Sequence, residues 1–335
     1  MSLPLLRVRN LKKYFPVCSK GFFKRRLGIV RAVNKISFTL DAKETLGLVG
    51  ESGCGKTTTA RTILRAVTPT EGNIFFDHSG TGEAVDLAGL REAGLKPLRQ
   101  HMQMIFQDPF SSLNPRMTVG QIIAEPMRIH KLAKGSELDD RVEAILKKVG
   151  LKPEHKARYP HAFSGGQRQR IGIARALIME PALVVADEAV SALDVSVQAQ
   201  VINLLDDLQD EFGVAYLFIA HDLGVVRHIC DRVAVMYAGR IVEMARTKDL
   251  FNNPLHPYTQ LLLASVPSPD PDVIMKMEEF SEVAYTGNLP FGCAFQPRCG
   301  QCSDGCQSGI PELLEVEAGH FVACLLRRGS KVSGR

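Results

Sequence analysis

One loop constrains this chain more than any other feature. The stretch GESGCGKTT, at residues 50–58, contains the pattern G-x-x-x-x-G-K-[ST]. A short apolar run at 45–49 precedes it, and a helix-like segment from Lys56 to about Ala66 follows it. Glycines let such a loop fold so that successive backbone N–H groups point at one phosphate, and the helix N-terminus adds positive potential. The sequence therefore predicts a phosphate site within a strand–loop–helix unit of an α/β protein.

The side chains of this loop predict its ligands. The charge of Lys56 can neutralise the β- and γ-phosphates of a nucleotide, and the Thr57 hydroxyl can coordinate Mg²⁺. We therefore expect ATP and Mg²⁺ to bind here. The residues expected to contact ATP in this loop are Gly50, Ser52, Gly53, Cys54, Gly55, Lys56, Thr57 and Thr58.

An acidic pair predicts how the nucleotide is hydrolysed. The apolar run 183–186 reads as a buried strand and ends in Asp187 and Glu188. Ligands of α/β proteins bind beyond the carboxyl ends of parallel strands. Asp187 is expected to hold Mg²⁺, directly or through water, and Glu188 to orient or deprotonate the attacking water. Taken alone, the two acids could equally begin an ordinary loop.

A glycine pair marks the start of a second helix. Ser164 and Gln167 fit a capping box, and the helix is expected to run through Leu177 and to end before Pro181. An ordinary helix start would explain the capping box. Because a helix N-terminus lined only by Gly165 and Gly166 also suits an anion, a binding role is the second interpretation.

The rest of the chain alternates strands and helices, which predicts a parallel α/β sheet. Residues 77–97 are polar and rich in glycine and read as a surface excursion, while 118–149 have mostly helical periodicity. The Pro-rich stretch 265–272 predicts a boundary, with a small Cys-bearing appendage after it. The other expected strands are 5–8, 36–40, 215–220 and 233–236, and a further helix is expected at 197–211.

Composition narrows the class of protein. The 335 residues, 45% of them hydrophobic and 23% charged, can bury a large core, and the length suggests about two domains. A net charge of +5, aromatic content of 7% and no Trp do not favour a surface that stacks single-stranded nucleic acid. No apolar stretch approaches the roughly 18 to 20 residues of a membrane span, and residues 1–10 lack a secretory signal, so we expect a cytoplasmic protein.

Several motifs together resemble those of the ATP-binding-cassette (ABC) ATPases. They are GESGCGKTT, FQDP at 106–109, FSGGQRQR at 163–170, VVADE at 184–188, SALD at 191–194 and AHD at 220–222. The resemblance covers about residues 5–250. It implies an α/β fold with a RecA-like parallel sheet core, an antiparallel β subdomain and a helical subdomain at about 113–178. The ATPase domain would be 1–255 and a small Cys-containing C-terminal extension 256–335.

The resemblance also implies roles for matching residues. Tyr14 would stack on adenine, with a partly buried structural Tyr as the alternative. Gln107 would reach Mg²⁺ and the attacking water, and His221 would touch the γ-phosphate. The residues that would contact ATP held by a second cassette are Ser164, Gly165, Gly166, Gln167 and Asp194. The active form would then be a head-to-tail pair that ATP closes.

Two residues depart from the family pattern. Phe163 stands where Leu is usual, and Ala189 stands where Pro usually follows the glutamate. Neither change removes a polar group, so we expect activity to survive. Ala189 could loosen the Glu188 loop and slow turnover modestly.

Five of the eight cysteines lie after residue 290. In a long chain without a signal sequence this favours a metal or cluster site over disulfides. Residues 256–271 and the later GCAFQPRC pattern resemble the C-terminal extension of oligopeptide, dipeptide and nickel importer ATPases. By that resemblance Cys293, Cys299, Cys306 and Cys324 would hold a [4Fe-4S] cluster. Four thiolates would also suit Zn²⁺, Cys302 adds a C-x₂-C with Cys299, and unmetallated thiols are the third interpretation.

The function implied is that of an energy-coupling subunit of an importer at the cytoplasmic face of the membrane. It would bind transmembrane permease subunits and a second ATPase subunit, identical or not, with an extracytoplasmic solute-binding protein in the full system. Peptides are the cargo by resemblance alone. The alternative is a soluble ABC ATPase acting on nucleic acid or ribosomes, which the single cassette and the lack of a basic stripe disfavour. A simple phosphate-loop kinase would leave FSGGQ without a role.

Overall fold

The computed structural model describes residues 3–19, 26–265 and 290–327. By its internal contacts the chain divides into two compact units. The first unit comprises residues 1–7, 39–45 and 75–220, and the second comprises 8–38, 46–74 and 221–335.

The first unit is built on parallel strands. Strand β7 (Leu183–Asp187) pairs in parallel with β6 (Met102–Ile105) on one side and with β8 (Ala215–Ala220) on the other. All residues of β7 and β8 are buried, which explains why these runs are continuously apolar instead of alternating. The predicted parallel sheet is therefore confirmed for this unit.

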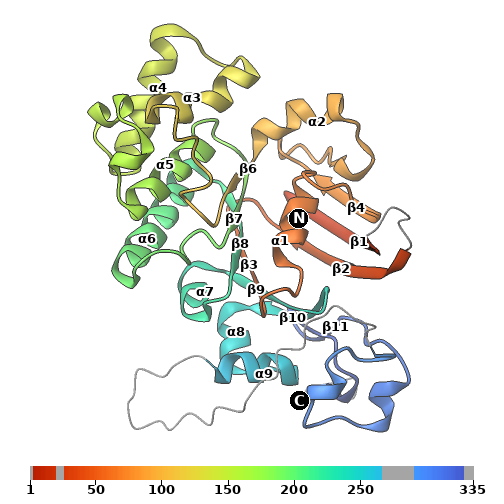
Figure 1. Ribbon diagram of the computed structural model, residues 1–335. Coiled ribbons are helices and arrows are strands. Elements are labelled where there is room, and N and C mark those ends of the chain that lie inside the picture. The colour runs from red at the N-terminus through yellow and green to blue at the C-terminus, as the bar shows by residue number, and fades with distance from the viewer. Residues whose placement is uncertain (1–2, 20–25, 266–289, 328–335) are drawn as a thin grey trace. The chain divides into compact units, whose positions relative to one another are not determined.

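The helices of the first unit confirm the predicted periodicity, except the first, which the sequence did not predict. They are α2 (Glu92–Leu98), α3 (Val119–His130), α4 (Gly135–Lys148), α5 (Gly165–Leu177) and α6 (Val195–Phe212). Helix α6 buries Val201, Leu204, Leu205 and Leu208 on one face. Helix α3 packs against both α4 and α5 (Figure 1). Lys131 adopts a left-handed conformation (φ 58°), which ends α3 and divides the region predicted as helical in two.

Residues 77–97 are more ordered than the sequence indicated. Strand β5 (Val85–Asp86) pairs antiparallel with Phe75 and Phe76 at the end of β4 (Glu71–Phe76). Helix α2 then buries Leu95 and Leu98. Most residues of the stretch are exposed, as expected of a surface excursion, but the sequence did not indicate its short strand and helix. Its few apolar residues are spaced too far apart to give a periodic signal, yet they pack.

The second unit contains β3 (Thr45–Val49) and a chain of paired strands beside it. Strand β3 pairs in parallel with β9 (Arg232–Tyr237), and β9 pairs antiparallel with β10 (Arg240–Arg246). A separate sheet has the strand order β2 (Arg26–Leu40), β1 (Leu6–Cys18), β4 and β5. The helices are α1 (Lys56–Ile63), α7 (Leu223–Ile229), α8 (Thr247–Asn252) and α9 (Pro257–Ala264).

The C-terminal residues extend the sheet that holds β3. Strand β12 (His320–Val322) pairs antiparallel with β10, and β11 (Leu314–Glu317) pairs antiparallel with β12. Short 3₁₀ turns at Gln296–Arg298, Asp304–Gln307 and Leu325–Arg327 complete this region. We call residues 290–327 the cysteine module. Most of the predicted boundary at 265–272 lies outside the described residues.

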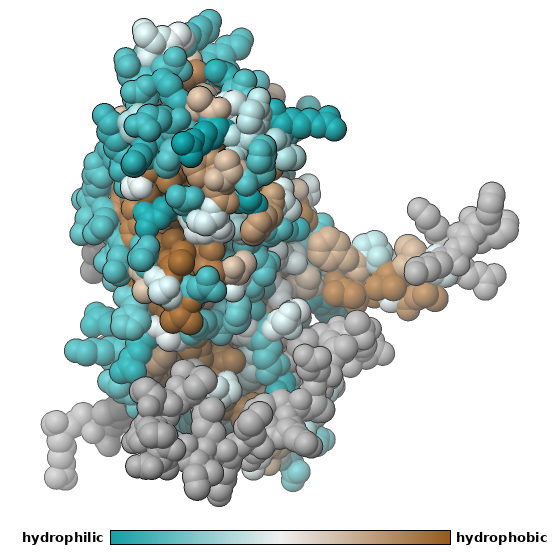
Figure 2. Space-filling model, turned by 60° about the vertical axis from the view of Figure 1, so that its left-hand side comes forward, coloured by the Kyte–Doolittle hydropathy of each residue, from teal (hydrophilic) through white to brown (hydrophobic). Residues whose placement is uncertain are grey.

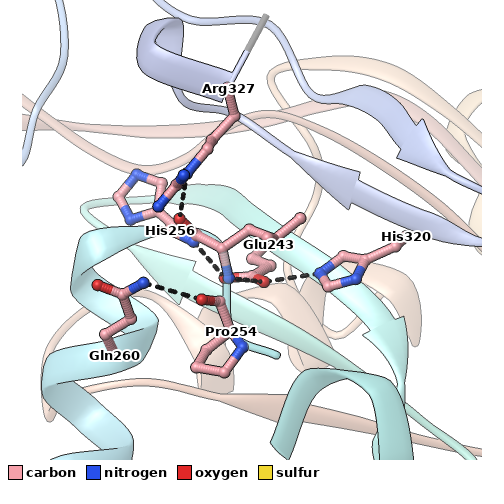
Figure 3. A network of polar contacts seen from close by, with 7 residues as sticks. Glu243, Pro254, His256, Gln260, His320 and Arg327 are labelled. Carbon is pink, nitrogen blue, oxygen red and sulfur yellow. Dashed lines mark hydrogen bonds and ion pairs between the residues drawn. The ribbon is translucent and has the colours of Figure 1, made fainter. Parts of the chain in front are cut away.

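A buried carboxylate joins the cysteine module to the sheet (Figure 3). Glu243 of β10 has no solvent exposure and accepts hydrogen bonds from the backbone N–H groups of Leu255 (2.7 Å) and His256 (2.8 Å). Its Oε1 also lies 2.7 Å from Nε2 of His320, which lies on β12. Arg327 adds a bond from Nε to the Leu255 carbonyl (3.3 Å). The module is therefore held by side chains as well as by strand pairing.

No helix among the described ranges is long and apolar enough to cross a membrane.

Candidate functional site

The phosphate loop is tightly packed around its glycines. Gly50 has φ 148° and Gly55 has φ 112°, which are conformations that L side chains rarely adopt. A Cβ atom at Gly55 would lie 2.1 Å from the Ala32 carbonyl oxygen, and one at Gly50 would lie 2.2 Å from that of Met236. Both positions therefore require glycine for space as well as for conformation.

The side chain of Lys56 folds back onto this loop. Its Nζ donates to the carbonyls of Gly50 (2.6 Å) and Glu51 (3.0 Å), so a buried positive charge lies at the loop. No side chain caps the N-terminus of α1, and the positive end of a helix favours an anion. Cys54 is buried, and burial raises the pKa of its thiol. The loop thus has the features of an anion site that the sequence predicted.

The carboxylate predicted to be catalytic follows the end of β7. Asp187 is 3% exposed, and Glu188 follows it with φ 48°, a strained backbone conformation for a residue other than glycine. The Glu188 N–H donates to the Ile219 carbonyl (2.9 Å), and the Ser191 hydroxyl donates to the Glu188 carbonyl (3.0 Å). These bonds fix the backbone from which the Glu188 side chain projects.

Gln107 orients that side chain. Its Nε2 donates to Oε2 of Glu188 over 2.7 Å, although the two residues are 81 positions apart. The contact arises because β6 and β7 are parallel neighbours, so the segments that leave their carboxyl ends meet. The structure therefore brings together two of the three predicted catalytic residues. The third, His221, is exposed and belongs to the second unit.

The predicted capping box at α5 is confirmed. The Ser164 hydroxyl accepts from the Gln167 N–H (3.4 Å), and the Gln167 side chain accepts from the Ser164 N–H (3.1 Å). Ser164 is exposed and Gly165 is half-buried. Asp194, at the start of α6, is exposed as well. These residues are thus accessible on the first unit.

Tyr14 is half-buried on β1, and its hydroxyl bonds the Asn34 side chain (2.8 Å). The Arg31 guanidinium lies 6.0 Å from its ring centroid. These contacts suit a structural Tyr, and the adenine-stacking role stays a prediction.

The two departures from the family pattern are both buried. Phe163 packs its ring edge against His155 with centroids 5.2 Å apart, and Ala189 is 1% exposed. Neither position presents a polar group to the site, as expected. The effect of Ala189 on turnover stays a prediction.

The cysteine module contains five free thiols in the described structure. Burial raises the pKa of Cys293 and Cys324, and a hydrogen bond from the Ser303 backbone lowers that of Cys306. Within residues 3–19, 26–265 and 290–327, however, no three metal-binding side chains are placed to hold an ion.

Comparison with known proteins fixes the family. The chain is 52% identical to the oligopeptide transport ATP-binding protein AppF of Bacillus subtilis (strain 168) over 96% of its own length and 97% of that protein's. Residues 33–191 match the family described as "ABC transporter". The chain belongs to the ABC transporter ATP-binding family. As a member of this family it is an ATP-hydrolysing cassette.

Other matches agree with this assignment. Residues 242–306 match the family "Oligopeptide/dipeptide transporter, C-terminal region". A probable peptide ABC transporter ATP-binding protein of Sinorhizobium fredii is 51% identical over 98% of this chain and 91% of its own. The dimeric post-hydrolysis structure of the ATP-binding cassette MJ0796 with ADP and Pi has a TM-score of 0.62 and 25% identity, covering 72% of this chain and 98% of that one. The cassette fold is thereby confirmed.

Sequence reasoning missed three residues at the phosphate loop. Arg298 of the cysteine module forms two bonds of 2.9 Å from its guanidinium to the Glu51 carboxylate. The Glu51 N–H donates to the Tyr258 hydroxyl (2.9 Å). Arg298 and Glu51 are 247 positions apart. No local pattern could have found this pair.

Proposed function

We propose that this ABC cassette powers the import of peptides or related small solutes through a membrane transporter. The observation that supports this best is the match to peptide transport ATP-binding proteins over 96% and 98% of the chain. The match includes the C-terminal region of oligopeptide/dipeptide transporters. The cassette would sit at the cytoplasmic face of the membrane on permease subunits, with an extracytoplasmic solute-binding protein in the full system. The same relatives do not favour an ATPase acting on nucleic acid or ribosomes.

The proposed chemistry uses the two groups described above. The loop around Lys56 would bind the β- and γ-phosphates, and Glu188, oriented by Gln107, would position and deprotonate water. Hydroxyl, carboxylate and amide oxygens, supplied by Thr57, Asp187 and Gln107, are the ligands that Mg²⁺ prefers, so the donor set fits this ion. Mg²⁺ would neutralise charge on the phosphates.

We further propose that the active form is a head-to-tail pair of cassettes. The exposed Ser164 start of α5 and exposed Asp194 support this, because such residues can reach a nucleotide held by another subunit. Beside Asp194, Val195 is 83% exposed, an apolar side chain that a partner could cover. ATP would then stabilise the pair by bridging it.

A surface for the permease would lie next to Gln107. Phe106 and Phe110 are exposed on either side of it. Arg175 and Arg168 lie over their rings, at 5.6 and 4.2 Å from the centroids. Apolar side chains also gather on the mostly hydrophilic face in Figure 2. A permease loop bound to this segment could act on Glu188 through Gln107.

The cysteines are proposed to belong to an extension at 256–335, after an ATPase domain at 1–255 with a helical subdomain at about 113–178. As placed, the side chains of Cys293, Cys299, Cys306 and Cys324 do not form a metal-binding group, so no step of the mechanism involves a cluster. A [4Fe-4S] cluster there stays a prediction. A brown colour after anaerobic purification would support it, and colourless protein with stoichiometric zinc would contradict it.

Substitution of Glu188 by Gln tests the proposal. This change keeps the size of the side chain but removes the base, so ATP binding should persist while hydrolysis falls at least about 100-fold. A dimer should accumulate with ATP by light scattering, and uptake of labelled peptide should be lost in cells that depend on this cassette. Glu154→Gln, an exposed change in the same unit, is the matched control. Full hydrolysis by Glu188→Gln would contradict the assignment, and normal peptide uptake without the gene would contradict the cargo.

A further inference from the structure

Glu51 is a carboxylate inside a loop that binds a polyphosphate. It stands between Gly50 and Ser52, and its side chain is 35% exposed. An uncompensated negative charge at this position would repel the phosphates of ATP. Sequence reasoning gave this residue no role, so its contacts decide what it does.

The cysteine module neutralises this charge. The Arg298 guanidinium is only 11% exposed and grips both carboxylate oxygens of Glu51 at 2.9 Å. A two-bond arginine–carboxylate pair fixes orientation as well as charge. Glu51 is thus held in one position by a residue distant in the sequence.

An aromatic cluster holds the arginine in place. The ring of Phe295, which is 2% exposed, packs against Tyr237 (5.2 Å) and Tyr258 (5.5 Å). The guanidinium of Arg298 lies 5.8 Å from the Phe295 ring centroid and 6.0 Å from that of Tyr237. Because the arginine is ordered by these rings, it loses little entropy on pairing with Glu51.

The backbone of Glu51 is held by two further contacts. Its N–H donates to the hydroxyl of Tyr258 on α9 (2.9 Å), and its carbonyl accepts from Lys56 (3.0 Å). Lys56 is the residue expected to contact the phosphates. The Arg298 pair and the Lys56 ammonium are therefore connected through a single residue of the loop.

We propose that Arg298 is a positioning residue for ATP binding, through which the cysteine module controls the phosphate loop. It neutralises Glu51 and holds the carboxylate away from the nucleotide. Because coupling between two sites is reciprocal, ATP in the loop must in turn stabilise the docked module. The proposal needs only the ATP binding of the family and is independent of the cargo.

A pair of substitutions tests this. Arg298→Gln should weaken MgATP binding and raise KM about five- to tenfold, with kcat changed less than about twofold, since Glu188 and Gln107 are untouched. A tenfold change corresponds to about 1.4 kcal/mol. Glu51→Gln should bind ATP as well as the native protein or better, because no charge remains to be neutralised. In the Glu51→Gln background, Arg298→Gln should have almost no further effect on KM.

Several results would overturn the proposal. One is an ATP dissociation constant of Arg298→Gln within twofold of the native value. Another is an equal loss of ATP binding on Arg298→Gln in the Glu51→Gln background, which would indicate a merely structural role for Arg298. If Arg298→Gln fails to fold, Arg298→Lys replaces it, with an expected two- to fivefold rise in KM that Glu51→Gln again removes. Arg141→Gln, which breaks the exposed Arg141–Glu137 pair, is the control for loss of an arginine. It should leave KM and the ATP dissociation constant unchanged.

Hydrogen exchange tests the reciprocal effect. In the native protein, MgATP should slow amide exchange at Gln296–Arg298 and around it. In Arg298→Gln this slowing should disappear while the rest of the phosphate loop still responds to ATP. Equal slowing in both proteins would mean that the module does not sense the loop through Arg298, and the proposal would fail.

Discussion

Replacing Glu243 by Gln should release the cysteine module from the cassette. The carboxylate is fully buried and accepts hydrogen bonds from the N–H groups of Leu255, His256 and His320. Gln has one acceptor oxygen and one donor NH₂. If the oxygen faces Leu255 and His320, the new NH₂ faces the donor N–H of His256. Neither rotamer can satisfy all three donors.

The size of the effect follows from this geometry. One hydrogen bond is lost and a buried donor is left without an acceptor, which costs about 1 to 3 kcal/mol. The remaining two bonds no longer end on a carboxylate, and each loses roughly 1 kcal/mol of charge assistance. We therefore expect a loss of about 3 to 5 kcal/mol of stability. At roughly 2 to 4 °C per kcal/mol for a unit of this size, Tm should fall by about 6 to 20 °C.

Differential scanning calorimetry measures this, since the protein has no Trp to report unfolding by fluorescence. The matched control is Glu315→Gln, because Glu315 is exposed on β11 and accepts one bond, from the Gly319 N–H (2.8 Å). That change should cost under about 0.5 kcal/mol. Hydrogen exchange should quicken at Ala323, whose N–H bonds the Val242 carbonyl. A Tm within 2 °C of the control, about the smallest shift expected of 1 kcal/mol, would refute the reasoning.

Two further predictions concern pH and the phosphate loop. Burial lowers the pKa of His256 to about 4 from 6.5, and its Nδ1 accepts from the Tyr258 N–H, so the neutral form is built into the fold. As the pH falls, the unfolded chain therefore binds the extra proton before the folded protein does. About 3 kcal/mol of stability, fully present above pH 6.5, should be lost as the pH falls toward 4. In urea titrations His256→Asn should flatten this pH dependence of stability, and an unchanged dependence would contradict the role of His256. Gly55→Ala should lower stability by about 2 to 4 kcal/mol because its Cβ would strike the Ala32 carbonyl, whereas Gly53→Ala, with nothing within 4 Å, should cost only about 1 kcal/mol. Equal melting temperatures for the two variants would show that the loop tolerates the contact.

Local chemistry made much of the site predictable. The spacing of Gly50, Gly55 and Lys56 is typical of a phosphate-binding loop, whose backbone needs glycine at fixed positions. The capping box of Ser164 and Gln167 depends on atoms three residues apart, and the structure confirms it. Continuous apolar runs identified β7 and β8 because strands buried on both faces carry no polar alternation.

Other features had no local signal. Residues 77–97 looked like a surface loop because a two-residue strand and a short helix are stabilised by packing and carry little periodicity. The cysteine module looked like an appendage, yet β12 pairs with β10 and makes it part of the sheet. Pairing between strands depends on backbone groups that nearly every residue type carries, so the local sequence does not predict which strands pair.

The sequence by itself determined that the loop at residues 50–57 suits the phosphates of a nucleotide, since the glycines and the lysine are a local requirement of that chemistry. Only the tertiary structure decided what holds the loop and what orients the base. Gln107 meets Glu188 across 81 residues, and Arg298 meets Glu51 across 247. Such contacts depend on which strands become neighbours, and that choice is made by the packing of the whole core rather than by any one segment.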